Sequence, residues 1–265
     1  MSTRIAFVGG GNMAHALATR LSGSWQGGIT VADPVAAQRA RFEDPITTTD
    51  DNLAAVADAA IIVLAVKPQI LEAVARQIAP ALGDQLVISI AAGVPIRALE
   101  TWLGANRSIV RCMPNTPALI GAGITGLVAN PSVSANQRAS ATELLAAAGE
   151  VVWFESDAEL DAVTALSGSG PAYFFYVIEA LAEAGARLGL RPDVATRLTI
   201  ATAAGAAAMA VDDDPATLRE RVTSPGGTTE RALAILAEQS LPATLDAAVR
   251  AAFHRSRELA EEFGK

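Results

Sequence analysis

Short apolar runs alternate with segments of helical spacing through the first half of the chain. Each run has the length and composition of a strand buried on both faces, and the runs occupy residues 4–8, 29–32, 61–66, 86–90 and 108–112. Helical segments lie between them, the first over residues 12–21. Strands that alternate with helices predict right-handed βαβ units and a doubly wound parallel sheet.

The pattern changes near Asp157, after which every regular segment has helical spacing. Helices are predicted over residues 172–189, 193–211, 216–222, 230–238 and 241–263. Alanine and glycine are frequent in the first two, so these helices can approach other helices closely. We therefore predict two domains: residues 1–156 contain the sheet, and residues 157–265 are entirely helical.

Composition narrows the class of protein. The 265-residue chain is 51% hydrophobic and its formal net charge is −8, which argues against nucleic acid as the main partner because phosphate binding needs a basic surface. The longest apolar runs are shorter than the ~18 residues of a membrane span. The single cysteine, Cys112, excludes an intramolecular disulfide. With no signal-peptide pattern at the N-terminus, these features predict a cytoplasmic protein.

The first apolar run ends in Gly9-Gly10-Gly11-Asn12-Met13-Ala14, which fits the pattern G-x-G-x-x-A. A strand precedes the motif, a helix follows, and an acidic residue ends the next strand, as in dinucleotide-binding turns. Gly9 permits the tight turn, Gly11 lets a pyrophosphate approach the backbone, and Ala14 lets the helix pack on the strand. Ligands of such sheets bind where strands end, and the other strand ends carry Asp33, Lys67-Pro68, Ala91–Gly93 and Asn115.

Asp33 bears on the choice of cofactor. A carboxylate at the end of the second strand accepts hydrogen bonds from the adenosine ribose and repels a 2′-phosphate, which favours NADH. Arg39 and Arg41 follow closely and soften that repulsion. Asp33 could instead cap a helix that begins at Pro34. Lys67 is similarly open to two interpretations, a contact with the negatively charged cofactor or a surface position.

A second glycine-rich segment, Ser224-Pro225-Gly226-Gly227-Thr228-Thr229, precedes a predicted helix. Glycines let backbone N–H groups converge, and the helix N-terminus adds partial positive charge, so the segment can bind a small anion. An ordinary helix start is the alternative interpretation. A chain with both a cofactor site and a separate anion site is most simply an enzyme.

The scarcity of proton donors limits the chemistry. The chain contains only two lysines, Lys67 and Lys265, and only two histidines, His15 and His254. None of the four lies near the second glycine-rich segment in sequence. Reduction of a ketone needs an acid for the developing alkoxide, whereas an imine nitrogen can arrive protonated and needs only positioning. A C=N substrate is therefore favoured, although Tyr173 or Tyr176 is a possible acid. The dispersed histidines and cysteine predict no metal site.

Together these segments resemble the pyrroline-5-carboxylate reductase family along nearly the whole chain. The most specific are Leu166–Tyr173, which reads Leu-Ser-Gly-Ser-Gly-Pro-Ala-Tyr, and Ser224–Leu233. The others are residues 7–14, 65–69, 91–93 and 111–117. The resemblance implies an α/β fold with an N-terminal Rossmann-like doubly wound sheet and an all-α C-terminal dimerisation domain.

The resemblance also implies hydride reduction of L-1-pyrroline-5-carboxylate to L-proline with NADPH or NADH. It assigns Thr229 to the ring nitrogen, and Ser224, Gly226, Gly227, Thr228 and Thr229 to the substrate. The cofactor contacts that it implies, together with Asp33, are Gly9, Gly10, Gly11, Asn12, Met13, Ala14, Asn52, Val66, Lys67, Pro68, Ala92, Gly93 and Asn115. Members of the family that use NADPH often carry Ser, Thr or Asn where this chain has Asp33, so the cofactor preference stays open.

The family implies a homodimer through the helical domain, in some members a decamer of five dimers. Two other functions fit parts of the sequence. A β-hydroxyacid dehydrogenase shares the two-domain plan, but such enzymes carry a catalytic lysine on the first long helix after a glycine-rich turn. In this chain that helix follows Gly170 and has no lysine there. A non-catalytic nicotinamide-binding protein would have no use for a second anion site.

Overall fold

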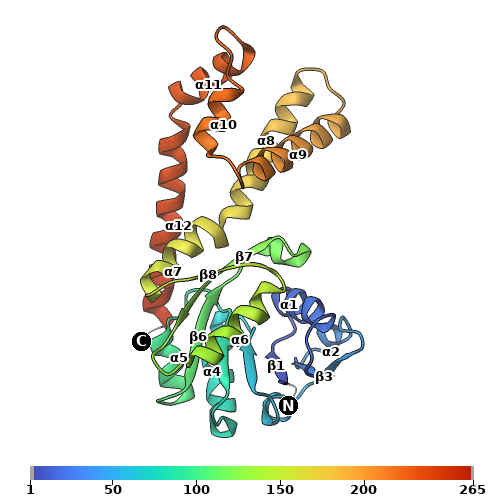
Figure 1. The fold of residues 1–265 in the computed structure, drawn as a ribbon, viewed down its shortest axis with the longest axis vertical. Coiled ribbons are helices and arrows are strands. Elements are labelled where there is room, and N and C mark those ends of the chain that lie inside the picture. Colours follow the sequence, from blue (N-terminus) through green and yellow to red (C-terminus); the bar gives the residue numbers. More distant parts are fainter. Residues whose placement is uncertain (1–2, 264–265) are drawn as a thin grey trace. The chain divides into compact units, whose positions relative to one another are not determined.

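The computed structural model describes residues 3–263 and divides into two compact units (Figure 1). The first unit runs to Ser169 and also includes the end of the chain from Ala252, and the second unit is Gly170–Ala251. The predicted division between residues 156 and 157 differs from this one. The helix that follows Ser156 packs against two strands of the sheet, and the last turns of the final helix belong to the same compact unit.

The first unit contains eight strands. They are β1 (Ile5–Val8), β2 (Ile29–Ala32), β3 (Ile46–Thr49), β4 (Ile61–Leu64), β5 (Leu86–Ser89), β6 (Ser108–Met113), β7 (Gly123–Ala129) and β8 (Gly149–Trp153). Its helices are α1 (Asn12–Ser22), α2 (Ala36–Arg39), α3 (Asn52–Ala57), α4 (Pro68–Ile78), α5 (Ile96–Leu103), α6 (Ala135–Ala146) and α7 (Asp157–Val163). Shorter turns are the 3-10 helices η1 (Ala79–Ala81) and η2 (Thr116–Ile120) and the π-helix η3 (Thr164–Gly168).

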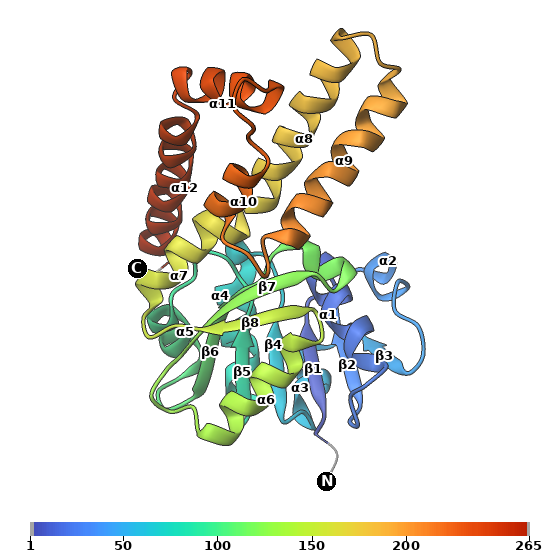
Figure 2. The same cartoon turned by 45° about the horizontal axis from the view of Figure 1, so that its top comes forward.

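The strand order β3-β2-β1-β4-β5-β6-β7-β8 begins with the order of a doubly wound dinucleotide-binding sheet (Figure 2). The predicted sheet is therefore confirmed. All pairings are parallel except β6 with β7. The registers Val8↔Leu64 and Leu64↔Ser89 bring the ends of β1, β4 and β5 to one edge of the sheet.

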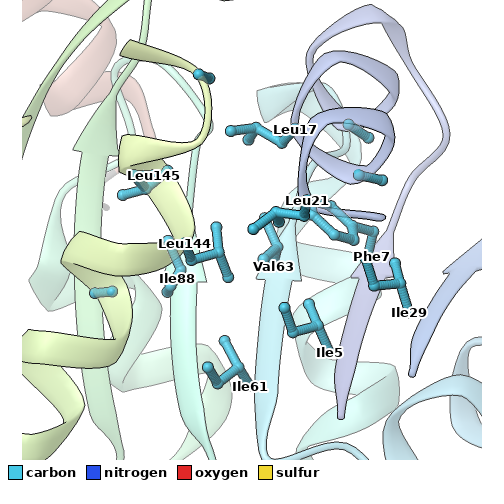
Figure 3. Close-up of a cluster of buried hydrophobic side chains, with 14 of the residues drawn as sticks. Ile5, Phe7, Leu17, Leu21, Ile29, Ile61, Val63, Ile88, Leu144 and Leu145 are labelled. Atoms are coloured by element: carbon cyan, nitrogen blue, oxygen red, sulfur yellow. The ribbon is translucent and has the colours of Figure 1, made fainter. Parts of the chain in front are cut away.

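Alternation along the strands builds two apolar layers. Ile5, Phe7 and Val63 face α1 and α6, where Leu17 and Leu144 complete one buried cluster (Figure 3). Ala6, Val8, Ile62 and Leu64 belong to a second cluster with buried residues of α3, α4 and α5. Each large side chain buried in this way contributes roughly 1.5–3 kcal/mol. These layers fix the sheet edge from which the glycine turn leaves.

The second unit contains α8 (Gly170–Arg187), α9 (Pro192–Met209), α10 (Pro215–Arg221), α11 (Thr228–Glu238) and the first part of α12 (Leu241–Phe263). All five predicted helices are confirmed, with starts up to two residues earlier. A Cβ added at Gly185 would lie 3.2 Å from the Ala195 Cβ, so small residues do let α8 and α9 approach closely. Among the described residues, no helix combines the length and apolarity needed to cross a bilayer.

Candidate functional site

The Gly9–Ala14 turn joins β1 to α1 at the sheet edge. Gly9 has φ +104°, and a Cβ there would lie 2.6 Å from the Ala65 carbonyl oxygen on the neighbouring chain segment. Gly11 is the N-cap of α1, in extended backbone, with no side-chain cap and no acidic residue in the first helical turn. A Cβ at Gly11 would meet nothing within 4 Å. The first-turn amides of α1 are therefore available to an anion, and there is room for it to approach.

The Asp33 carboxylate ties β2 to this turn. Its Oδ2 accepts a hydrogen bond from the Gly10 N–H at 2.8 Å, and its Oδ1 accepts one from the Val35 N–H at 2.8 Å. The alternative prediction, that Asp33 caps a helix beginning at Pro34, is wrong, because α2 starts at Ala36 with Val35 as its N-cap. Asp33 thus shapes the turn as well as presenting negative charge beside it.

Two arginines surround the loop after β2. Arg39 Nη1 donates to the carbonyl oxygens of Asp33 at 2.7 Å and Pro34 at 3.1 Å. Arg41 Nη2 donates to Asn12 Oδ1 at 3.1 Å, which links this loop to the start of α1. Both guanidinium groups therefore hold the loop that carries Asp33 and the start of α1, and among the described residues neither forms an ion pair with the Asp33 carboxylate.

The loops after β3, β4 and β5 carry further residues predicted to contact the cofactor. Asn52 starts α3 and donates from Nδ2 to Gln77 Oε1 at 2.9 Å. Lys67 is exposed and is the N-cap of α4, with Pro68 in the first position of that helix. Its side chain makes no capping hydrogen bond, so the ammonium is available to a ligand.

Asn115 follows β6, and its amide already has partners within the first unit. Its Oδ1 accepts from the Ile124 N–H at 3.0 Å. Its Nδ2 donates to the carbonyl oxygen and the hydroxyl of Ser167, each at 3.3 Å. Ser167 belongs to η3, which is a π-helix. Asn115 therefore fixes this irregular segment, a contact that the sequence did not indicate.

The Ser224–Thr229 turn opens α11 in the second unit. Gly227 is the N-cap in extended backbone, again with no side-chain cap, and Gly226 has φ +72°. The Gly227 N–H donates to the Ser224 carbonyl oxygen at 3.0 Å. Thr228 and Thr229 lie in the first helical turn, where N–H groups have no acceptor within the helix. The turn therefore offers donors to an anion.

Glu230, which the sequence analysis missed, reaches back across this turn. Its Oε2 accepts a hydrogen bond from the Gly226 N–H at 2.7 Å. The amides of Gly226 and Gly227, both predicted to contact substrate, are thus engaged within the turn. A glutamate three positions after an N-cap is a known capping signal, so Glu230 could have been found from sequence.

The two histidines, which are candidate proton donors, are not arranged as a catalytic group. His15 Nε2 lies 3.2 Å from the Arg41 carbonyl oxygen, and its ring is 5.2 Å from the Phe42 ring. His254 packs edge-on against Phe253. Among residues 3–263, no three His, Cys, Asp or Glu side chains gather in a way that could hold a metal ion.

Comparison with known proteins agrees with this architecture. Residues 4–93 match a family model described as NADP oxidoreductase, coenzyme F420-dependent. Residues 157–259 match one described as pyrroline-5-carboxylate reductase dimerisation. With the observed sheet and glycine turn, the first match defines an oxidoreductase with a nicotinamide-dinucleotide fold.

Relatives over the full length are more specific. The chain is 50% identical to a pyrroline-5-carboxylate reductase of Pseudomonas aeruginosa over 273 aligned residues, covering 100% of both chains. It is 40% identical to the Haemophilus influenzae enzyme of that name, covering 96% of this chain and 97% of the other. The chain therefore belongs to the pyrroline-5-carboxylate reductase family.

Solved structures give the same result. A pyrroline-5-carboxylate reductase from Coxiella burnetii matches with a TM-score of 0.92 at 40% identity, covering 98% of this chain and 99% of the other. The Plasmodium falciparum enzyme, solved with NADP bound, matches with a TM-score of 0.88 at 30% identity, covering 97% and 98%. The predicted fold and family are confirmed.

Proposed function

We propose that this chain reduces the imine of L-1-pyrroline-5-carboxylate to L-proline, the final step of proline biosynthesis. The observation that carries the proposal is the turn before α11, where first-turn amides lie next to threonine hydroxyls. This donor set suits a substrate with a carboxylate beside a C=N group. Family membership supports the same reaction.

In this proposal the turn divides its work between two substrate groups. The amides of Thr228 and Thr229 and the Ser224 hydroxyl hold the carboxylate, aided by the positive end of the α11 dipole. Gly226 and Gly227 act through their backbone conformation, since their own amides have other partners. The Thr229 hydroxyl hydrogen-bonds the ring nitrogen and so orients the imine carbon.

The first unit holds the cofactor. The open amides at Gly11–Ala14 would hold the pyrophosphate, Asp33 would contact the adenosine ribose, and Lys67 would offer a cation to the phosphates. Val66, Pro68, Ala92 and Gly93, from the loops after β4 and β5, would make the remaining contacts with the cofactor. NADPH or NADH, when bound, supplies the hydride. The Asp33 charge favours NADH, whereas Arg39 and Arg41 favour a 2′-phosphate.

No residue has to donate a proton at the reacting nitrogen. A cyclic imine can bind in its protonated form, and addition of hydride at carbon then gives the neutral amine. The site needs to hold the protonated nitrogen with an acceptor, and the Thr229 hydroxyl can accept as well as donate. The lack of a catalytic histidine or lysine is therefore consistent with this substrate.

We propose further that the helical unit forms a homodimer, with a decamer of five dimers as the larger assembly. Large apolar side chains of α8 are exposed in the single chain, among them Phe174 at 71%, Phe175 at 64% and Tyr176 at 73%. Monomers rarely expose so large an apolar surface. Light scattering coupled to gel filtration would measure the assembly, and a monomer would contradict this part of the proposal.

We also place the reaction in the cytoplasm. The single cysteine, Cys112, is buried and leaves no intramolecular disulfide to form, which fits a reducing compartment. Its Sγ donates to the Ser89 carbonyl oxygen at 3.4 Å.

The decisive experiment is steady-state reduction of pyrroline-5-carboxylate by the purified protein, with NADPH and NADH compared at equal concentrations. We expect turnover with both cofactors and a product identified as L-proline. Cofactor binding without turnover would favour a non-catalytic nicotinamide-binding protein. Turnover of a β-hydroxyacid but not of the imine would favour a β-hydroxyacid dehydrogenase.

A further inference from the structure

The end of the chain packs on a loop at the cofactor edge of the sheet. The loop, residues 90–95, joins β5 to α5 and contains Gly93, which is buried with φ +75°. A Cβ built on Gly93 would lie 2.8 Å from the Cβ of Leu259 in the last turns of α12. Contact this close admits only glycine at position 93. Leu259 therefore forms one wall of the loop.

A second contact ties the same turns of α12 to the first unit. Ser256, one turn before Leu259, is 2% exposed, and its Oγ donates to Asp161 Oδ1 at 2.9 Å. Arg111 also approaches that carboxylate, with its Nη2 3.6 Å from Asp161 Oδ1. The last turns of α12 are thus joined to α7 and β6 by a buried polar contact, and Figure 1 shows the end of α12 beside α7.

The polar contact continues to the far end of the loop. Arg111 Nη1 donates to Asp157 Oδ1 at 2.7 Å, and Asp157 Oδ2 accepts from the Ile96 N–H at 2.8 Å. Ile96 is the first residue of α5, immediately after the loop. Phe263 packs against the same apolar cluster as Ile96 and Val66. The loop is therefore fixed at Gly93 by Leu259 and at Ile96 through the contacts that begin at Ser256.

We propose that Leu259 and Ser256 are positioning residues of the cofactor site, which fix the 90–95 loop without touching the cofactor. This inference rests on the proposed function, because it takes Ala92 and Gly93 as cofactor contacts. If the loop were free to shift, part of the free energy of cofactor binding would be spent on ordering the loop. The last turns of α12 thus set cofactor affinity.

The test is a titration of cofactor binding by fluorescence in the absence of substrate. We expect Leu259→Ala to raise the Kd of both NADPH and NADH about tenfold. At saturating cofactor, the KM for pyrroline-5-carboxylate should stay within about twofold of wild type, since the loop acts on cofactor binding. Leu259→Met, which nearly conserves volume, should restore the wild-type Kd.

A matched control separates positioning from general loss of stability. Leu144→Ala removes a fully buried leucine from α6, on the other face of the sheet. It should lower Tm while leaving the cofactor Kd unchanged. Equal weakening of binding by Leu144→Ala, or an unchanged Kd in Leu259→Ala, would overturn the proposal.

Ser256→Ala is a milder second variant, should Leu259→Ala fail to fold. We expect a rise in the cofactor Kd of about threefold, because Asp161 keeps Arg111 as a partner. No change in this variant would overturn the role of Ser256. Because binding is measured without substrate, absence of turnover in the wild type would overturn the proposed reaction alone.

Discussion

Two glycine-rich turns in this chain open helices with nearly the same backbone. Gly11 before α1 has φ −67° and ψ −178°, and Gly227 before α11 has φ −81° and ψ 169°. In each turn the preceding glycine donates its N–H to a carboxylate, Gly10 to Asp33 and Gly226 to Glu230. Both turns leave first-turn amides available for an anion.

The surroundings of the two turns differ. Gly9 and Gly10 are buried, and the backbone of Ala65, which follows β4, lies against Gly9. The carboxylate that shapes this turn comes from another strand. At the second turn Gly226 is exposed with nothing within 4 Å of an added Cβ, and its carboxylate comes from its own helix. The first turn is thus held by the fold, whereas the second depends mainly on local contacts.

This contrast predicts that one substitution has different effects at the two turns. Gly9→Ala combines a positive φ with a Cβ 2.6 Å from the Ala65 carbonyl oxygen, so it should cost about 2–5 kcal/mol of folding free energy and abolish cofactor binding. Gly226→Ala meets only backbone strain, about 1–2 kcal/mol, and should raise the substrate KM. Denaturant unfolding and cofactor titration measure both. Equal losses of stability would contradict the contrast.

The next largest effect is expected at Thr229. Thr229→Ala should lower kcat/KM about 10- to 100-fold, equivalent to the ~1.5–3 kcal/mol of a hydrogen bond to a charged group. The cofactor Kd and Tm should not change, because the hydroxyl makes no other hydrogen bond among the described residues. Thr244→Ala, on exposed α12 surface, is the control. Unchanged turnover in Thr229→Ala would remove the threonine from the mechanism.

At the first turn, Asp33 is expected to act on both cofactor choice and turn geometry. Asp33→Ser should shift the ratio of kcat/KM for NADPH over NADH upward by about tenfold, because repulsion of the 2′-phosphate is lost. It should also lower Tm, since one serine hydroxyl cannot accept hydrogen bonds from the N–H groups of both Gly10 and Val35.

Asp33→Asn tests the charge with the side-chain shape kept. It leaves one acceptor oxygen and turns its amide nitrogen toward the N–H of Gly10 or Val35, so Tm should fall about as in Asp33→Ser. A ratio shifted equally in both variants would assign cofactor choice to charge. An unmoved ratio in both variants would leave Asp33 with a role in the turn alone.

Sequence predicted the features that depend on neighbouring residues. The five mostly apolar strands β1, β2, β4, β5 and β6 and the glycine turn were found because each is encoded in one continuous segment. β3, β7 and β8 were missed: β3 is largely threonine, β7 contains two glycines, and β8 alternates between half-buried and exposed residues. None of the three has the continuous apolar character of a doubly buried strand.

The contacts that complete the cofactor edge of the sheet could not be predicted from the sequence, for a different reason. Asn115 on Ser167 and Leu259 on Gly93 join residues far apart in the chain. No periodicity or spacing encodes such pairs, since they depend on where the packed elements bring their ends. Glu230 was an exception, because its partner Gly226 lies only four residues away.

The smallest effect is expected at Glu230, and it tests whether the second turn is shaped locally. Glu230→Gln keeps an acceptor for the Gly226 N–H but removes a negative charge beside the proposed carboxylate site. We expect the KM for pyrroline-5-carboxylate to fall about two- to threefold at low salt, and the difference to shrink as salt screens the charge. Glu230→Ala removes the acceptor as well, so the turn loosens and KM should rise above the wild-type value. A KM that moves the same way in both variants would show that charge and turn geometry are not separable there.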